Sequence, residues 1–155
     1  MNPCRCGYLG DASRECSKAP RCGEEYLNRI SGPLLDRIDM VVHVQPTPPV
    51  ELSRAPPGEA SAVVAKRVAQ ARSVQRKRYG AGTNAEADLD AIILQPAARE
   101  LVEQAAERLR LSSRGFTRVL RVARTIADLA GAAEVRRADV AEALAYRHRI
   151  PGRGR

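Results

Sequence analysis

Four cysteines near the start of the chain have residue types and spacing that suit a metal site. Cys4 and Cys6 form a C-x-C pair, and Cys16 and Cys22 follow in the same glycine-containing segment. Clustered thiols in a cytosolic chain favour metal binding over disulfides. Four thiolates form the tetrahedral ligand set of a structural zinc site and leave no position for a catalytic water. The sequence therefore predicts structural Zn²⁺, with free thiols as the alternative.

Arg37 follows a short segment that is suited to hold it in a fixed place. Gly32-Pro33 ends whatever precedes it, because proline fixes φ and lacks an amide hydrogen. The apolar residues after this break have helical spacing and are expected to anchor one turn, with Arg37 pointing away: Leu34, Leu35 and Ile38. At a subunit boundary, such a guanidinium can neutralise charge on a neighbour's γ-phosphate. A surface ion pair with Asp36 or Asp39 is the alternative.

Arg114 is a second candidate, at the start of an expected helix. There it can reach across a cleft while Phe116 and Val119 anchor the helix. The alternative is a helical arginine that only contacts solvent. Further arginines recur along the outer side of this helix and are interpreted as a solvated face: Arg118, Arg121 and Arg124. The two histidines, His43 and His148, carry no catalytic role in this interpretation.

The elements that must position these side chains follow from apolar spacing and helix breakers. Residues 1–22 read as a loop, residues 24–30 have helical composition, and the β-branched segment 40–44 is typical of a strand. A strand needs partners for its backbone hydrogen bonds. Either those partners lie outside this chain, or the segment is not a strand here.

The second half of the chain predicts a small helical bundle. A proline-rich linker with little capacity for regular structure comes first, and glycine, proline and serine then mark the helix ends. The first helix has an apolar stripe made of Val64, Val68 and Ala71. The expected helices cover residues 59–79, 96–109, 113–130 (after a cap at Ser112 or Ser113) and 137–146.

Composition limits the function classes without choosing one. The hydrophobic fraction of 44% suffices for a core, but only 3% of residues are aromatic, so the core must come from Ala, Val, Leu and Ile. No apolar run reaches the length of a membrane span, and a cytosolic location is expected. The net charge of +8 permits an anionic partner such as nucleic acid. Neither a Walker phosphate loop nor a Mg²⁺-binding acidic pair occurs.

Three segments, in order, resemble one family. They are Met1 to Gly7 (Met-Asn-Pro-Cys-Arg-Cys-Gly), Ser31 to Asp39, and Ser113 to Leu129. The chain is similar to the ComM/YifB group of magnesium-chelatase-like AAA+ ATPases over essentially its whole length. The resemblance implies that the chain is the C-terminal part of a longer protein, the parent. The remainder of the parent's AAA+ core would carry the Walker motifs and most of the sheet.

The resemblance also implies roles for individual residues. Asn2 falls at the first sensor, which positions the attacking water. Arg37 falls at the arginine finger, and Arg114 at the second sensor, which contacts nucleotide from the helical lid. In many members the second cysteine pair is also C-x-C, whereas here Lys18 stands in that place and Cys22 comes later. Family members are hexameric ATPases that use ATP and Mg²⁺, and ComM-type members are linked to DNA branch migration.

The expected fold is therefore mostly α: a helical-bundle AAA+ lid preceded by an incomplete α/β AAA+ core remnant with one strand and a Cys-rich loop. The expected boundaries are 1–45 for the core remnant, 46–58 for the linker, 59–147 for the lid and 148–155 for a disordered tail. The isolated chain is expected to be inactive as an ATPase. Two rival interpretations are a zinc-bearing basic DNA-binding module and a plain helical interaction domain.

Overall fold

The computed structural model describes residues 2, 4–11, 13–42, 44 and 47–147. His43 and the tail 148–155, including His148, lie outside these described residues. In the described part the structure is mostly helical, as predicted, with one isolated parallel bridge between Leu94 and Val135 and no extended strand. None of the described helices is both long enough and apolar enough to cross a membrane.

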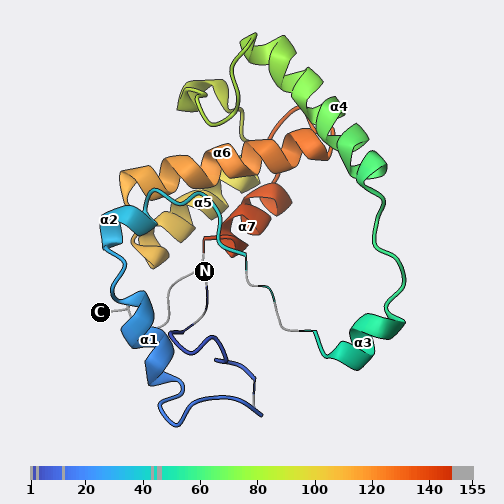
Figure 1. The fold of residues 1–155 in the computed structure, drawn as a ribbon. Helices are drawn as coiled ribbons and strands as arrows, with labels where there is room; N and C mark the ends of the chain where they lie inside the picture. The colour runs from blue at the N-terminus through green and yellow to red at the C-terminus, as the bar shows by residue number, and fades with distance from the viewer. Residues whose placement is uncertain (1, 3, 12, 43, 45–46, 148–155) are drawn as a thin grey trace.

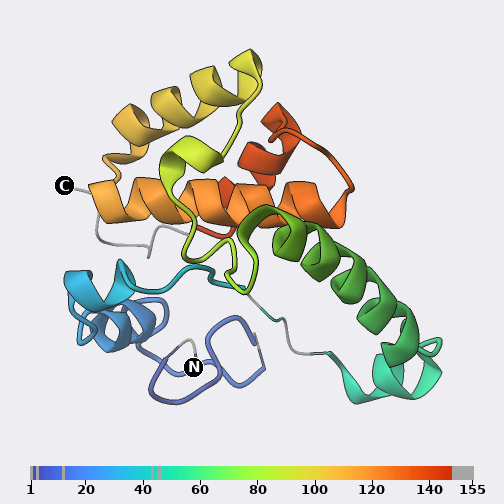
Figure 2. The same ribbon diagram turned by 90° about the horizontal axis from the view of Figure 1, so that it is seen from above.

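The long helices and a 3₁₀ turn gather in one part of the molecule, and the short α-helices lie outside it (Figure 1). The long elements are α4 (Ser61–Tyr79), α5 (Pro96–Leu109), α6 (Ser113–Leu129) and α7 (Arg137–Ala145). The short ones are α1 (Arg21–Leu27), α2 (Gly32–Leu35), α3 (Pro49–Arg54) and the 3₁₀ turn η1 (Leu89–Ala91). Figure 2 shows α1 and α2 on the side of α6 opposite to α5.

Local signals explain where the bundle helices begin. Pro96 starts α5, where its missing N–H costs no intrahelical bond. The Ser112 side chain caps α6 by accepting a hydrogen bond from the Gly115 N–H at 3.0 Å. At α7, the Asp139 carboxylate accepts from the Arg136 N–H at 2.8 Å. These signals lie within a few residues of each helix start, so the sequence reveals them.

The core lies where α5, α6 and α7 meet, and it contains small and branched apolar residues. Val119, Leu120 and Ala123 of α6 are buried, and Val119 is one of the two residues that were expected to anchor this helix. The other buried apolar residues of this cluster are Ile92, Ala98, Val102, Ala127, Val135, Val140 and Ala143. Phe116, the only phenylalanine, packs against the cluster from its edge. Side chains this small allow the helices to approach closely.

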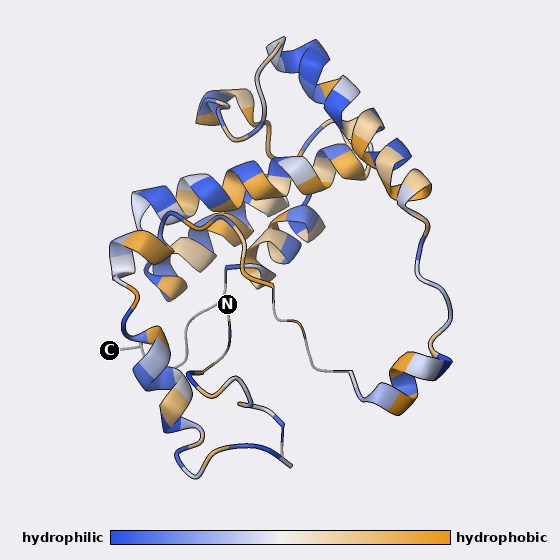
Figure 3. Ribbon diagram, in the orientation of Figure 1, coloured by the Kyte–Doolittle hydropathy of each residue, from blue (hydrophilic) through white to orange (hydrophobic). Residues whose placement is uncertain are grey.

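Helix α4 departs from the predicted pattern. Its expected stripe is wrong for two of three positions, since Val64 and Val68 are 37% and 49% exposed and only Ala71 is buried. Residues 61–70, in the N-terminal half of α4, are all exposed, so apolar positions there remain uncovered (Figure 3). The C-terminal half packs on α6.

Two further segments differ from the regular structure that composition suggests. The sequence left open whether segment 40–44 is a strand in this chain, and residues 40–42 and 44 are not in one; the Val41 N–H donates to the Tyr146 carbonyl at 2.9 Å. No described strand lies beside them, so a ladder cannot form. The linker, expected to be irregular, contains α3, whose first residue is Pro49. Proline has the φ angle that a first helical turn needs, which favours this short helix.

A buried polar network joins α4 to α6, where the sequence predicted a solvated face. Arg124 is 2% exposed and donates to the Asp128 carboxylate at 2.8 Å and to the carbonyls of Ala132 and Ala133. Arg78 donates two further hydrogen bonds to Asp128, at 2.8 and 3.1 Å. Arg124 is therefore a structural residue, because its charge is paired and every contact is internal.

The other two arginines of the expected solvated face also have protein partners. Arg121 donates to the Ala87 carbonyl at 3.0 Å, and Arg118 forms an ion pair with Asp39. The solvated-face interpretation is thus wrong for this side of α6. Arginine type and spacing could not show it, because the partners come from other parts of the chain.

We expect Asp128→Ala to lower the free energy of unfolding by about 3–5 kcal/mol, because it leaves the Arg124 charge buried without a partner. Burial alone would raise the pKa of Asp128, but hydrogen bonds from Arg78 and Asn84 and the Arg124 charge hold that pKa below its usual value. The Asp128 contribution is therefore complete above the unfolded pKa of about 3.9 and is lost as the pH falls toward the lower native pKa.

Urea unfolding of the 155-residue chain at pH 7 and between pH 5 and 2 measures both effects. The exposed Asp88, replaced by alanine, is the matched control. Two results together would show that the network contributes nothing to stability. The Asp128→Ala variant would be as stable as this control at pH 7, and its free energy of unfolding would fall between pH 5 and 2 as that of the control does.

Candidate functional site

The cysteine loop brings its thiols together. The Sγ atoms of Cys4, Cys6 and Cys22 all lie within 4.8 Å of one another, and those of Cys4 and Cys6 are 3.1 Å apart. Cys4 is fully buried, and Cys22 stands in the first turn of α1. The loop turns back through Gly7, whose φ of +83° is a conformation that favours glycine. Three donors thus converge on one point.

Cys16 is near this group but not one of the mutually close sulfurs. A backbone hydrogen bond at Lys18 and thiol contacts with Cys22 and Cys6 lower its pKa. The thiol of Cys6 lowers the pKa of Cys4 to about 7, whereas burial raises that of Cys22 to about 12. Contacts of this kind are expected when several thiols share one small space.

The cysteine cluster fits a tetrahedral thiolate site in ligand type and in spacing. With Zn–S bonds of about 2.3 Å, neighbouring sulfurs in such a site are about 3.8 Å apart. The Sγ atoms of Cys4 and Cys6 are 3.1 Å apart, and no two of the three sulfurs are more than 4.8 Å apart, so all three are close enough to bind one ion. Cys4, Cys6 and Cys22 are therefore the residues that would hold an ion, and Cys16 is the fourth candidate.

Arg37 follows α2 and has an exposed side chain. No described residue makes a hydrogen bond or ion pair with its guanidinium. The two acidic neighbours that could have paired with it are occupied elsewhere. Asp36 accepts from Ser112 at 2.9 Å and from Arg147 at 3.2 Å, and Asp39 pairs with Arg118. The alternative ion pair does not form in the described structure, so Arg37 remains available.

The expected apolar anchoring of this turn is wrong for two of its three residues, and only Leu35 is half-buried. Leu34 and Ile38 are 51% and 39% exposed, so they bury little. The turn is held instead by the contacts of Asp36 and by the Ile38 carbonyl, which accepts from Arg147 at 2.8 Å. Its partners belong to α6 and to the end of α7, far along the chain, and short-range spacing cannot reveal them.

Arg114 lies in the first turn of α6, exposed, and also without a described partner. It follows Ser112 by two residues, and Arg37 follows Asp36 by one. The Ser112–Asp36 hydrogen bond therefore brings the two candidate arginines to the same region of the molecule. The sequence made both arginines candidates, but it could not predict that both lie close to the Ser112–Asp36 hydrogen bond.

Asn2 occupies a different place. Its side chain lies against the cysteine loop, with Nδ2 3.7 Å from where a Cβ on Gly7 would be. No described contact links Asn2 to Arg37 or to Arg114. The structure thus associates Asn2 with the candidate metal loop and the two arginines with the start of α6.

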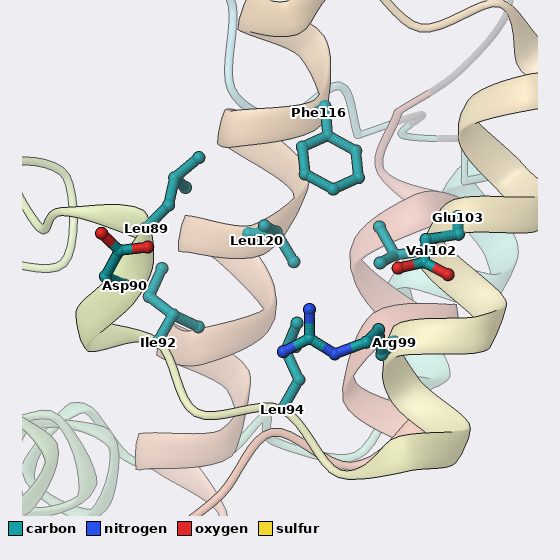
Figure 4. A pocket seen from close by; sticks show the side chains of 9 residues that line it. All are labelled: Leu89, Asp90, Ile92, Leu94, Arg99, Val102, Glu103, Phe116 and Leu120. Atoms are coloured by element: carbon teal, nitrogen blue, oxygen red, sulfur yellow. The ribbon is translucent and has the colours of Figure 1, made fainter.

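A pocket of about 270 Å³ between α5, α6 and the 89–94 segment was not predicted (Figure 4). Its lining combines apolar residues with three charged ones, Asp90, Arg99 and Glu103, and Arg99 extends into it from α5 (Figure 4). None of the candidate site residues lines it. The sequence could not predict this pocket, because the apolar residues that line it have the same spacing as ordinary core residues.

Comparison with known proteins shows the family to which this chain belongs. Residues 58–147 match the family described as magnesium chelatase, subunit ChlI C-terminal, and residues 1–52 match magnesium chelatase, subunit ChlI. The chain belongs to the magnesium chelatase ChlI C-terminal family. The resemblance noted from the sequence is thereby confirmed, and so is a helical lid as the main part of the fold.

Individual relatives extend the match to nearly the whole chain. It is 38% identical to competence protein ComM of Haemophilus influenzae over 152 residues, which is 95% of this chain and 29% of that protein. It is 36% identical to the protein YifB of Escherichia coli over 158 residues, again 95% and 29%. The YifB protein of Salmonella typhimurium is likewise 36% identical. The chain thus spans less than a third of the length of these relatives.

Proposed function

We propose that this chain is the C-terminal part of a ComM/YifB-type magnesium-chelatase-like ATPase that acts as a hexameric ring. In this proposal it supplies an arginine finger, a lid sensor and a first sensor for ATP hydrolysis. The observation that carries it is the state of Arg37: exposed, without a described partner, and next to two aspartates that are held by other residues. A finger arginine must be free of local ion pairs to reach another subunit's nucleotide.

Each residue has a distinct task in the proposed mechanism. The planar, permanently charged fork of Arg37 would neutralise negative charge that develops on the γ-phosphate in the adjacent subunit. Arg114 would contact nucleotide bound to its own subunit, and Asn2 would orient the attacking water. ATP and Mg²⁺ would be held by the remainder of the parent's core, since the 155-residue sequence contains no Walker phosphate loop.

We further propose that the parent acts on DNA in the cytoplasm. The net charge of +8 suits a polyanionic substrate. The name of one relative, competence protein ComM, agrees with a role in handling DNA. The free thiols suit a reducing compartment. Measuring ATP hydrolysis by the parent with and without double-stranded DNA tests this part, and equal rates would contradict it.

Structural Zn²⁺ in the cysteine loop is a separate proposal. It rests on the convergence of Cys4, Cys6 and Cys22. The loop has little apolar content, and a bound ion would supply the order that a hydrophobic core gives elsewhere. The expected effect of removing the metal is large and is argued in the Discussion.

Arg114→Ala in the full-length parent tests the lid role. We expect ATP affinity to fall about 10- to 100-fold, since a hydrogen bond to a charged group contributes about 1.5–3 kcal/mol. Nucleotide titration by fluorescence measures it. Arg137→Ala is the matched control, because Arg137 is also an exposed arginine in the first turn of a helix. Equal affinities of the two variants would remove Arg114 from the nucleotide site.

A further inference from the structure

A set of polar contacts ties the segment around Arg37 to the lid. Asp36 accepts from Ser112 Oγ at 2.9 Å through one oxygen and from Arg147 Nη2 at 3.2 Å through the other. Arg147 Nη1 donates at 2.8 Å to the Ile38 carbonyl. Figure 1 shows the result: α2 lies beside the start of α6 and apart from the far end of the bundle. We call Asp36, Ser112 and Arg147 the polar clamp.

Ser112 belongs to both sides of this clamp. Its hydroxyl oxygen accepts from the Gly115 N–H at 3.0 Å and so caps α6, while its hydrogen is donated to Asp36. The path from one candidate arginine to the other is therefore short. It runs from Arg37 through the adjacent Asp36, across one hydrogen bond to Ser112, and along two residues to Arg114.

Gly115 leaves the space that the clamp needs. A Cβ on this residue would lie 2.9 Å from Arg147 Nη2 and 3.4 Å from Ser112 Oγ. The first distance is too short for a non-bonded contact, so a methyl group there would displace the guanidinium of Arg147 from Asp36. The end of an arginine side chain moves easily, so the helix itself should tolerate the substitution.

Stability alone does not explain these contacts. The Arg147 and Asp36 side chains are 13% and 41% exposed, and pairs that are partly open to solvent add little to stability. Leu34 and Ile38 of the same turn are 51% and 39% exposed. The orientation of the turn on the lid therefore depends largely on polar contacts: the polar clamp at the turn itself and the Asp39–Arg118 pair just after it.

We propose that Asp36, Ser112 and Arg147 are positioning residues that couple the finger arginine to the lid arginine of the same subunit. This inference rests on the proposed function. Arg114 would contact nucleotide in its own subunit and Arg37 nucleotide in the next, so the clamp would carry lid movement at one site to the adjacent site. Energetic coupling between sites needs such a physical link between two elements that move together.

Two variants of the full-length parent test the coupling. Gly115→Ala displaces Arg147 without removing any charge, and alanine favours the α6 helix. Asp36→Asn weakens the Arg147 pair but keeps an acceptor for Ser112. We expect both to lower kcat by about 10- to 100-fold, as misplacement of a reacting group does, and to reduce the Hill coefficient for ATP toward 1. ATP affinity and the thermal unfolding midpoint should stay at wild-type values.

The control is Arg67→Ala, which breaks an exposed bidentate pair with Glu59 that does not involve the finger segment. The Gly115→Ala and Asp36→Asn effects should not add in the double variant, because both disrupt one contact. Wild-type kcat and Hill coefficient in both single variants would overturn the coupling. If those values persist while Arg37→Ala is inactive, only the coupling fails; if Arg37→Ala is fully active, the proposed function fails.

Discussion

Replacing Arg37 by alanine in the full-length parent should abolish ATP turnover, with a loss of about 10³- to 10⁵-fold in kcat. The loss is this large because the guanidinium would act on charge that exists only in the transition state. Affinity for ATP should change little, since the residue would contact nucleotide of another subunit. Steady-state hydrolysis and nucleotide titration of the same preparation separate the two quantities.

Controls distinguish a finger from a general effect of charge. Arg29→Ala removes a nearby exposed arginine and should leave turnover unchanged. Arg37→Lys keeps the charge but loses the planar fork, and we expect it to recover only part of the rate. Rings mixed from Arg37→Ala subunits and wild-type subunits should lose activity in proportion to the interfaces affected. Wild-type turnover in the Arg37→Ala parent would remove the assignment.

The second large effect is expected from removing zinc, which should make the first part of the chain lose its ordered structure. We expect one Zn²⁺ per chain after purification without chelators, measured by atomic emission. Apparent binding free energies of about 10–16 kcal/mol are typical of structural zinc in small domains, so the loop should lose its structure without the ion. Amide hydrogen exchange in residues 4–27 should rise on chelation, while exchange in α5, α6 and α7 stays slow.

Single cysteine variants identify the ligands. Cys4→Ser, Cys6→Ser and Cys22→Ser should each reduce zinc content, because these sulfurs converge. Cys16→Ser asks whether the fourth thiol completes the tetrahedron. Ser13→Ala in the same loop is the control. The proposal would be contradicted if the purified protein contained no metal and if the amide hydrogens of the loop exchanged as slowly after chelator treatment as before.

The sequence predicted those parts of the fold that depend on local signals. The bounds of α5 were predicted as they are found, and Ser112 caps α6 as one of two candidates. Both depend on a residue type at a helix end and on apolar spacing within one helix. The overall mostly-α class follows from the same signals, since a core poor in aromatic residues requires closely packed helices.

The remainder depended on contacts between distant residues. Arg124 has the spacing of a solvated arginine, yet it is buried because Asp128 and two carbonyls surround it. Residues 40–42 and 44 have strand composition but are not in a strand, because no described strand lies beside them. The first half of α4 has an apolar stripe that the described residues leave exposed. In each case the missing information was which other segment lies alongside.

In the candidate site, too, local signals could be predicted from the sequence and contacts between distant residues could not. Residue types and their order made the cysteines, Arg37 and Arg114 candidates, and their roles remain predictions. The contacts that place the two arginines near each other come from Asp36 and Ser112, which are 76 positions apart in the chain. Spacing within a short window cannot detect such a contact. The turn before Arg37 was assigned apolar anchors for this reason, although polar ones hold it.

The most direct test is a structure of the assembled parent ring with a non-hydrolysable ATP analogue bound. We predict that the Arg37 guanidinium of one subunit lies within about 3 Å of a γ-phosphate oxygen held by its neighbour. The account would be contradicted by a fully loaded ring in which this guanidinium faces solvent and another side chain contacts that phosphate.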